Sequence, residues 1–213
     1  GIFPVPSLIP VLESGEQEVQ IFPGISSNGL ADFRIIHPMF TIYEAFHNLN
    51  PTEIDTIRPT FEYKSDVNFL FLEDFETSNS LSQDLDNNAE TRVVVTQDSV
   101  FEGTRSGEIL LEGENAIFEV GSQLLYEIDD PTNVFIEMHY KNDVDFEFGI
   151  LSERNGVVLE KIYAVGVFAS DEWRKIYIDV TNHVKAMKSN GGEEFQLIIR
   201  SFNPPTNEPA FNY

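Results

Sequence analysis

Short runs of alternating apolar and polar residues, separated by turn residues, most limit the fold of this chain. In residues 134–140 every second residue is apolar, and the alternation recurs at 146–150 and 176–180. A period of two places successive side chains on opposite faces of a β-strand. Asn155 and Gly156, between two such runs, are typical of a hairpin turn. We therefore predict an all-β sandwich.

Other segments complete this pattern. Further strands are expected at 18–22, 31–36, 91–96, 106–111, 116–120, 157–163 and 195–202. Asn28 and Gly29 predict a turn between the first two of these strands. Residues 180–188 differ, because apolar residues at 180, 184 and 187 precede two glycines. They predict a short helix or turn with Thr181 or Asn182 as its N-cap.

Residues 68–76 begin as an apolar, aromatic run and then become acidic at Glu73, Asp74 and Glu76. We interpret them as a buried strand whose exit is held at a surface or by a cation. Prolines are concentrated before this point, which argues against long helices there. We therefore predict two regions: residues 1–67 as a partial β-sandwich or packed arm, and residues 68–213 as the main β-sandwich.

Composition excludes several kinds of chemistry. The chain has no cysteine, so it has no disulfide, no thiolate metal site and no cysteine nucleophile. Its net charge is −23, which repels nucleic-acid phosphates and anionic lipid headgroups and favours divalent cations as surface ligands. No apolar run approaches the roughly 20 residues that span a bilayer. The chain starts without Met, so it is either a processed product or begins with a Gly left after removal of a tag, which leaves room for an export signal upstream.

The sequence contains no recognisable catalytic motif. The four histidines are His37, His47, His139 and His183, and none has the spacing of a zinc site. There is no Gly-x-Ser-x-Gly elbow and no phosphate-binding loop. With 36 acidic residues, some close carboxylate pairs arise by chance, so no pair can be singled out for glycoside hydrolysis. We predict that the protein is not an enzyme.

Two regions of the sequence resemble known families. Residues 71–76 and 100–109 are similar to the opening of galactose-binding-like jelly rolls, the architecture of many carbohydrate-binding modules, and 172–181 resemble a late strand of these domains. In the first region, residues 9–15, 22–25, 28–29 and 37–40 resemble uncharacterised Bacteroidetes-type surface lipoproteins. The resemblance implies a jelly roll at 68–213. It also implies a location in the cell envelope, surface-exposed or periplasmic, through a lipid anchor upstream of this chain. The lipid-bearing cysteine and a strand at each end are then expected beyond this sequence.

The jelly-roll resemblance also implies a structural Ca²⁺ ion. Glu76 would supply a carboxylate, and carbonyl oxygens around Gly103 and Ser106 would supply neutral ligands, which suits a hard cation. The alternative is that the acidic residues form a solvated strand exit with Arg105 as their counter-charge.

Aromatic side chains give candidate sugar-binding positions. Trp173, the only tryptophan, and Tyr177 share one face of a strand by the period of two. Tyr140 and Tyr163 are further candidates. The alternative for each is packing in the core, where Trp is commonly buried.

We therefore expect a non-catalytic ectodomain of a cell-surface lipoprotein that binds glycans or assists their use. The expected partner is a glycan or a surface protein. Nucleic acid is not expected, and the membrane is contacted only through the upstream anchor. Two alternatives remain open: a structural or protein-interaction component of a surface assembly, and a divergent glycan-active enzyme.

Overall fold

The computed structural model describes residues 13–111 and 117–202, which form two compact units. The first contains the residues up to Ile25 together with Ile35–Val67. The second contains Ser26–Arg34 together with the residues from Asn68 onward. The segment Ser26–Arg34 therefore belongs to the second unit, although it lies inside the first predicted region.

The first unit is built on an antiparallel pair of strands. β1 (Gly15–Ile21) and β4 (Tyr43–Leu49) pair along their whole length, with Gly15 opposite Leu49 and Ile21 opposite Tyr43. In both strands half-buried residues alternate with exposed ones, as expected when only one face is covered. The predicted strand at 18–22 is therefore confirmed within β1.

A second, short pair joins β2 (Gly24–Ser26) to β3 (Arg34–Ile36). Asn28 and Gly29 lie between these strands, with φ angles of 55° and 73°. The predicted turn at Asn28 and Gly29 is confirmed, but it joins β2 to β3.

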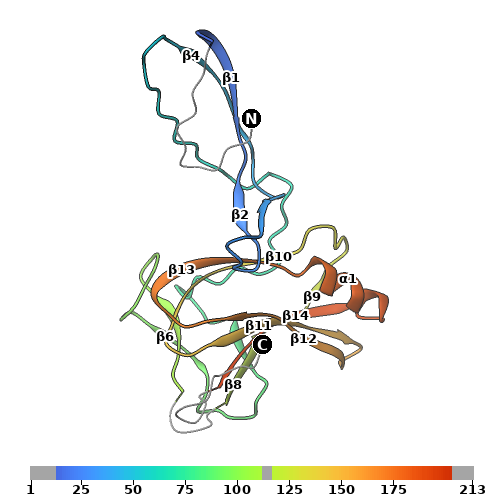
Figure 1. Cartoon of the computed structure of the whole chain (residues 1–213). Coiled ribbons are helices and arrows are strands. Elements are labelled where there is room, and N and C mark those ends of the chain that lie inside the picture. Colours follow the sequence, from blue (N-terminus) through green and yellow to red (C-terminus); the bar gives the residue numbers. More distant parts are fainter. Residues whose placement is uncertain (1–12, 112–116, 203–213) are drawn as a thin grey trace. The chain divides into compact units, whose positions relative to one another are not determined.

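The second unit contains three sheets (Figure 1). In the largest, the strand order is β12 (Val157–Val167), β11 (Phe146–Arg154), β14 (Glu194–Phe202), β8 (Ile117–Ser122), β5 (Leu81–Asp84), with β9 (Tyr126–Glu127) also paired to β14. The two smaller sheets are the pairs β10 (Phe135–Asn142) with β13 (Ser170–Asp179) and β6 (Val93–Thr96) with β7 (Ser106–Ile109).

The core of the second unit lies between the sheets. Phe118 and Phe148 of the six-stranded sheet and Ile178 of β13 are almost completely buried in one cluster. Burial of each such side chain contributes about 1.5–3 kcal/mol. Figure 1 shows β10 and β13 as one layer next to the layer of β11 and β14, and both layers contribute residues to the buried cluster. The all-β prediction is thus confirmed with its sheets packed, whereas the jelly-roll order of connections stays a prediction.

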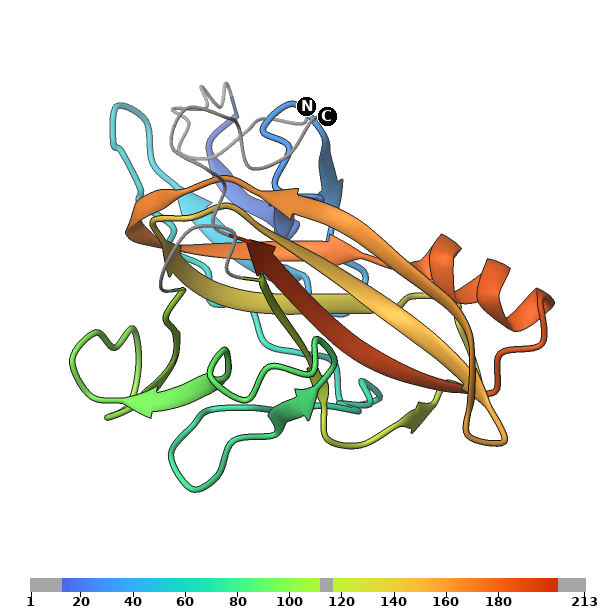
Figure 2. The same ribbon diagram turned by 90° about the horizontal axis from the view of Figure 1, so that it is seen from below.

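The predicted helix is confirmed as α1 (Thr181–Ser189), which lies at one end of the long strands (Figure 2). Val184 and Met187 bury its apolar face. The predicted cap is wrong, because Val180 is the N-cap and offers no side-chain hydrogen bond. Asp179 instead accepts the N–H of Thr181 at 2.9 Å, which satisfies one of the free donors at the helix start.

The predicted hairpin turn at Asn155 and Gly156 is confirmed, and it joins β11 to β12. Asn155 and Gly156 have φ angles of 52° and 76°, the left-handed conformation at both central positions that a type I′ turn requires. Arg154 pairs with Val157 directly across this turn.

The buried strand predicted at 68–72 is wrong. These residues form no strand, and Leu72 is 75% exposed. The acidic residues fold the following segment into turns, because Glu73 accepts the N–H groups of Phe75 and Ser80. Phe75 has a φ of 59°, which no extended strand allows. Its side chain nevertheless packs against the core.

Candidate functional site

One face of the β10–β13 pair collects aromatic and charged side chains. Ile176 and Ile178 of β13 are buried in the core, so the alternation of the strand directs Trp173, Lys175 and Tyr177 to the opposite face. The register of the pair then brings two residues of β10 to this face. His139 lies opposite Lys175, and Glu137 lies opposite Tyr177.

An aromatic platform, defined as Phe101, His139 and Trp173, forms on this face. The rings of Phe101 and His139 stack with centroids 4.0 Å apart and an interplanar angle of 17°. The ring of Trp173 lies 5.9 Å from that of Phe101. Phe101 remains 50% exposed, so a large aromatic surface is accessible beside two half-buried rings.

Charged groups border the platform. Lys175 forms an ion pair with Glu137 and lies 5.1 Å from the centroid of the Tyr177 ring. Burial lowers the pKa of Lys175, but its hydrogen bonds with Glu137 and Tyr177 outweigh burial, so the pKa is raised. The ammonium group therefore stays charged at neutral pH.

His139 is held in its neutral form. Burial lowers its pKa most, and the positive charge of Lys175 lowers it further, against the opposing effect of Glu137 and Glu102. A neutral imidazole presents an uncharged aromatic face to Phe101, which matches the near-parallel stacking of the two rings.

Phe101 is carried by a hairpin loop, residues 97–105, that connects β6 to β7. Glu76, which lies outside the loop in the sequence, binds two of its residues, Thr104 and Arg105. One carboxylate oxygen accepts the N–H groups of Thr104 at 2.6 Å and Arg105 at 3.0 Å, and the other accepts the hydroxyl of Thr104. The Thr104 hydroxyl and these N–H groups, with the charge of Arg105, lower the pKa of Glu76 although burial raises it.

Of the residues predicted to bind calcium, Gly103 lies beside Glu76, and hydrogen-bond donors face the carboxylate. Gly103 lies next to Glu76, with φ of +73°, and the Ser106 hydroxyl donates to the carbonyl of Ser99 at 2.6 Å. Among the described residues no group of three or more His, Asp or Glu side chains could hold a metal ion. Calcium binding at Glu76 stays a prediction of the sequence resemblance alone, and treatment with a chelator decides between it and an attachment made by hydrogen bonds.

The four predicted sugar-binding aromatic residues fall on different surfaces. Trp173 and Tyr177 share the outer face of β13, as the period of two implies. Tyr140 faces the core, where it packs edge-on against Phe146 with centroids 5.7 Å apart, so we do not place it in the site. Tyr163 lies on the six-stranded sheet.

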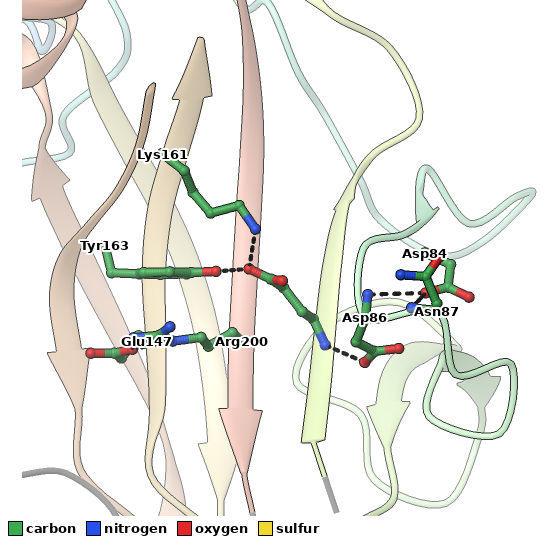
Figure 3. Close-up of polar contacts among 8 residues, drawn as sticks. Asp84, Asp86, Asn87, Glu147, Lys161, Tyr163 and Arg200 are labelled. Carbon is green, nitrogen blue, oxygen red and sulfur yellow. Dashed lines mark hydrogen bonds and ion pairs between the residues drawn. The ribbon is translucent and has the colours of Figure 1, made fainter. Parts of the chain in front are cut away.

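Tyr163 belongs to a polar row on that sheet (Figure 3). Its hydroxyl and the Lys161 ammonium both bind Glu119, the latter at 2.7 Å. The Arg200 guanidinium lies 3.9 Å from the centroid of the Tyr163 ring and pairs with Glu147. These charges satisfy one another across four strands, so the row has a structural explanation within the sheet.

The loop after β5 borders this row (Figure 3). Asp84 accepts the N–H groups of Asp86 and Asn87 at 3.1 and 2.7 Å. Asp86 accepts the N–H of Glu119 at 2.7 Å. The carboxylates here stabilise turns and fix the loop to β8.

A hollow of about 500 Å³ opens beside this loop. Its apolar lining comes chiefly from Leu81, Ala89, Val93, Val94, Val95 and Val120. Its carboxylates, Asp84 and Glu119, are those already bound to backbone N–H groups, Lys161 and Tyr163.

Comparison of the chain with protein-family models, with curated proteins and with solved structures finds no match. Within 13–111 and 117–202, no helix has the length and apolar character needed to cross a membrane. The candidate site therefore has to be interpreted from its own geometry.

Proposed function

We propose that the protein is a non-catalytic ectodomain of a cell-surface lipoprotein and that its aromatic platform binds a glycan. The observation that carries this proposal is the half-exposed ring of Phe101, supported from behind by His139 and Trp173. An aromatic face carries negative charge density that attracts the C–H groups of a pyranose ring. A ring fixed in advance by stacking loses little conformational entropy when a sugar binds.

The border of the platform suits the hydroxyl groups of a sugar. The carboxylate of Glu137 can accept hydrogen bonds from sugar hydroxyl groups, and the ammonium of Lys175 can donate hydrogen bonds to hydroxyl oxygens. A few placed polar groups beside an apolar surface are the usual composition of a small-molecule site. Tyr177, next to Lys175, adds a second ring at the same edge.

The proposed ligand class is a neutral, hexopyranose-containing glycan. Lys175 is already paired with Glu137, and Glu102 lies close enough to His139 to influence its pKa. These carboxylates, together with a net charge of −23, repel uronic acids and sulfated sugars. The lipid anchor upstream of this chain, and hence the envelope location, belong to the same proposal.

The test is a glycan array with the intact chain, followed by calorimetric titration of the glycans that bind. We expect Phe101→Ala and Trp173→Ala each to weaken binding about tenfold, the effect of losing a central aromatic contact of roughly 1.4 kcal/mol. The matched control is Leu124→Ala, which removes a 62% exposed apolar side chain beside the six-stranded sheet. Unchanged affinity in both platform variants, with melting temperatures preserved, would contradict the proposal.

The same titrations test for catalysis. We expect that bound glycans are recovered intact after incubation with the protein, with and without Ca²⁺. Product release above a heat-inactivated control, lost on substitution of a single carboxylate, would favour the glycan-active enzyme.

A second candidate function is protein–protein interaction through the first unit. Among the described residues, β1 and β4 pair only with each other, so each has an outer edge, and Phe46 on β4 is 68% exposed. An open strand edge can pair with a strand of another protein. Binding of a surface protein that Phe46→Asp abolishes, with no glycan bound on the array, would favour this candidate.

A further inference from the structure

The hairpin loop that carries Phe101 is fixed at two places. At its base Thr96 pairs with Ser106 in the β6–β7 ladder, and the Ser106 hydroxyl donates to the carbonyl of Ser99. Beyond Phe101, Thr104 and Arg105 donate to Glu76, which precedes them by 28 and 29 residues. Phe101 lies between these two attachments.

The second attachment fits a carboxylate closely. Two N–H groups and one hydroxyl converge on its oxygens, and the Arg105 side chain also donates to the Glu76 carbonyl at 3.3 Å. Gly103 allows this approach, because a Cβ there would lie 2.4 Å from the carboxylate oxygen. The positive φ of Gly103 would in addition strain any other residue.

We propose that Glu76 is a positioning residue whose carboxylate holds the hairpin loop so that Phe101 lies against His139 and Trp173. The carboxylate suits this place because its negative charge strengthens all three hydrogen bonds. In Glu76→Gln the amide oxygen can still accept the two N–H groups, but these bonds lose the charge, and the attachment of the loop is weakened. The effect of Glu76 on glycan affinity rests on the proposed function, whereas its effect on the loop does not.

Backbone amide exchange tests the loop directly. We expect Glu76→Gln to raise exchange at Thr104 and Arg105 on the order of tenfold, the effect of removing the charge that strengthens these hydrogen bonds. The matched control is Asp74→Asn. Asp74 accepts the N–H of Glu76 at 3.0 Å, and an asparagine can still accept it, so exchange in the loop should not change.

Trp173 gives a second readout, since it is the only tryptophan and its ring lies 5.9 Å from that of Phe101. The fluorescence emission of the Phe101→Ala variant gives the emission of Trp173 when the Phe101 ring is absent. We expect the emission of Glu76→Gln to shift from the wild-type value toward that of Phe101→Ala, and Asp74→Asn to match the wild type. Wild-type exchange at residues 104 and 105 in a folded Glu76→Gln variant would overturn the proposal.

Treatment with a chelator distinguishes an attachment of the loop made by hydrogen bonds from one made through a bound cation. We expect EDTA to leave wild-type exchange at 104 and 105 unchanged, and an EDTA-dependent increase would overturn the proposal. The glycan array is a separate readout. An array without bound glycan contradicts the proposed function, whereas exchange and emission alone decide the role of Glu76.

Discussion

At the scale of single residues, the neutral state of His139 links the platform to pH. Because burial lowers its pKa below the ordinary value of 6.5, the unfolded chain binds this proton more readily than the folded chain does. The stability that depends on neutral His139 is therefore fully present above pH 6.5. It is lost as the pH falls through the lower pKa of the folded state.

We predict that the free energy of unfolding falls between pH 7.5 and pH 5.5, and that His139→Phe reduces this fall. The variant keeps an aromatic ring against Phe101 but removes the titrating group. The effect is small, because the histidine is partly exposed and solvent screens its charge interactions. Urea unfolding of both proteins at the two pH values measures it. An equal fall in both would show that other groups cause the pH dependence.

Residue contacts also show which part of the site the sequence could predict. Trp173 and Tyr177 were placed on one face by strand alternation alone, because a period of two needs no tertiary information. Phe101 could not be placed, because its position depends on a loop conformation set by Glu76. His139 alternates with the apolar residues of its strand, so its face follows from the sequence, but its ring partner comes from that loop.

At the scale of secondary-structure elements, the β11–β12 ladder contains an irregularity at a glycine. The register shifts between Phe148 and Gly149, where Gly149 pairs with Tyr163. A Cβ at Gly149 would lie 2.0 Å from the backbone carbonyl oxygen of Ile162. Such a contact is with backbone, so a side chain cannot relieve it by changing rotamer.

We predict that Gly149→Ala destabilises the protein by at least about 2 kcal/mol, because the ladder must shift to admit a methyl group. For a chain of this size that corresponds to a melting temperature lower by about 4–8 °C. The control is Gly24→Ala, where a Cβ meets nothing within 4 Å, and we expect a change within about 0.5 kcal/mol. Thermal unfolding by circular dichroism compares them, and a wild-type melting temperature for Gly149→Ala would contradict the prediction.

Elements with strong local signals were predicted well. The Asn155–Gly156 hairpin and the strands from β10 to β14 follow from alternation and turn chemistry, which act over a few residues. Residues 68–72 were assigned wrongly because an apolar run of this length has no unique structure. The carboxylate of Glu73 accepts the backbone N–H groups of Phe75 and Ser80. These hydrogen bonds stabilise turns after residue 72, where a strand would need extended backbone.

At the scale of the whole molecule, the net charge of −23 favours the binding of cations. Binding of Ca²⁺ at Glu76 can therefore be tested directly. A cation that binds only the folded state raises its stability by mass action. If Glu76 binds Ca²⁺, chelator lowers the melting temperature of the wild type and not that of Glu76→Gln.

We expect instead that the substitution lowers the melting temperature equally in calcium and in EDTA, because the hydrogen bonds that it weakens involve no ion. This follows from the donors of Thr104 and Arg105 that already occupy the carboxylate. Differential scanning calorimetry in both buffers decides between the two. A chelator-dependent drop in the wild type alone would establish the ion.

The second unit also begins before the first is complete, and this affects the order in which the protein can be made. Asn28 accepts the N–H of Asp179 at 2.8 Å, across 151 residues of chain, and its own N–H donates to Tyr177. At ribosomal rates of about 5–20 residues per second, the segment around Asn28 waits roughly 8–30 seconds for this strand to be synthesised. Until β13 has been synthesised, the segment around Asn28 has no strand edge to pair with. A gene fragment starting at residue 68 would encode that edge permanently uncovered, whereas one starting upstream of residue 26 would keep its cover.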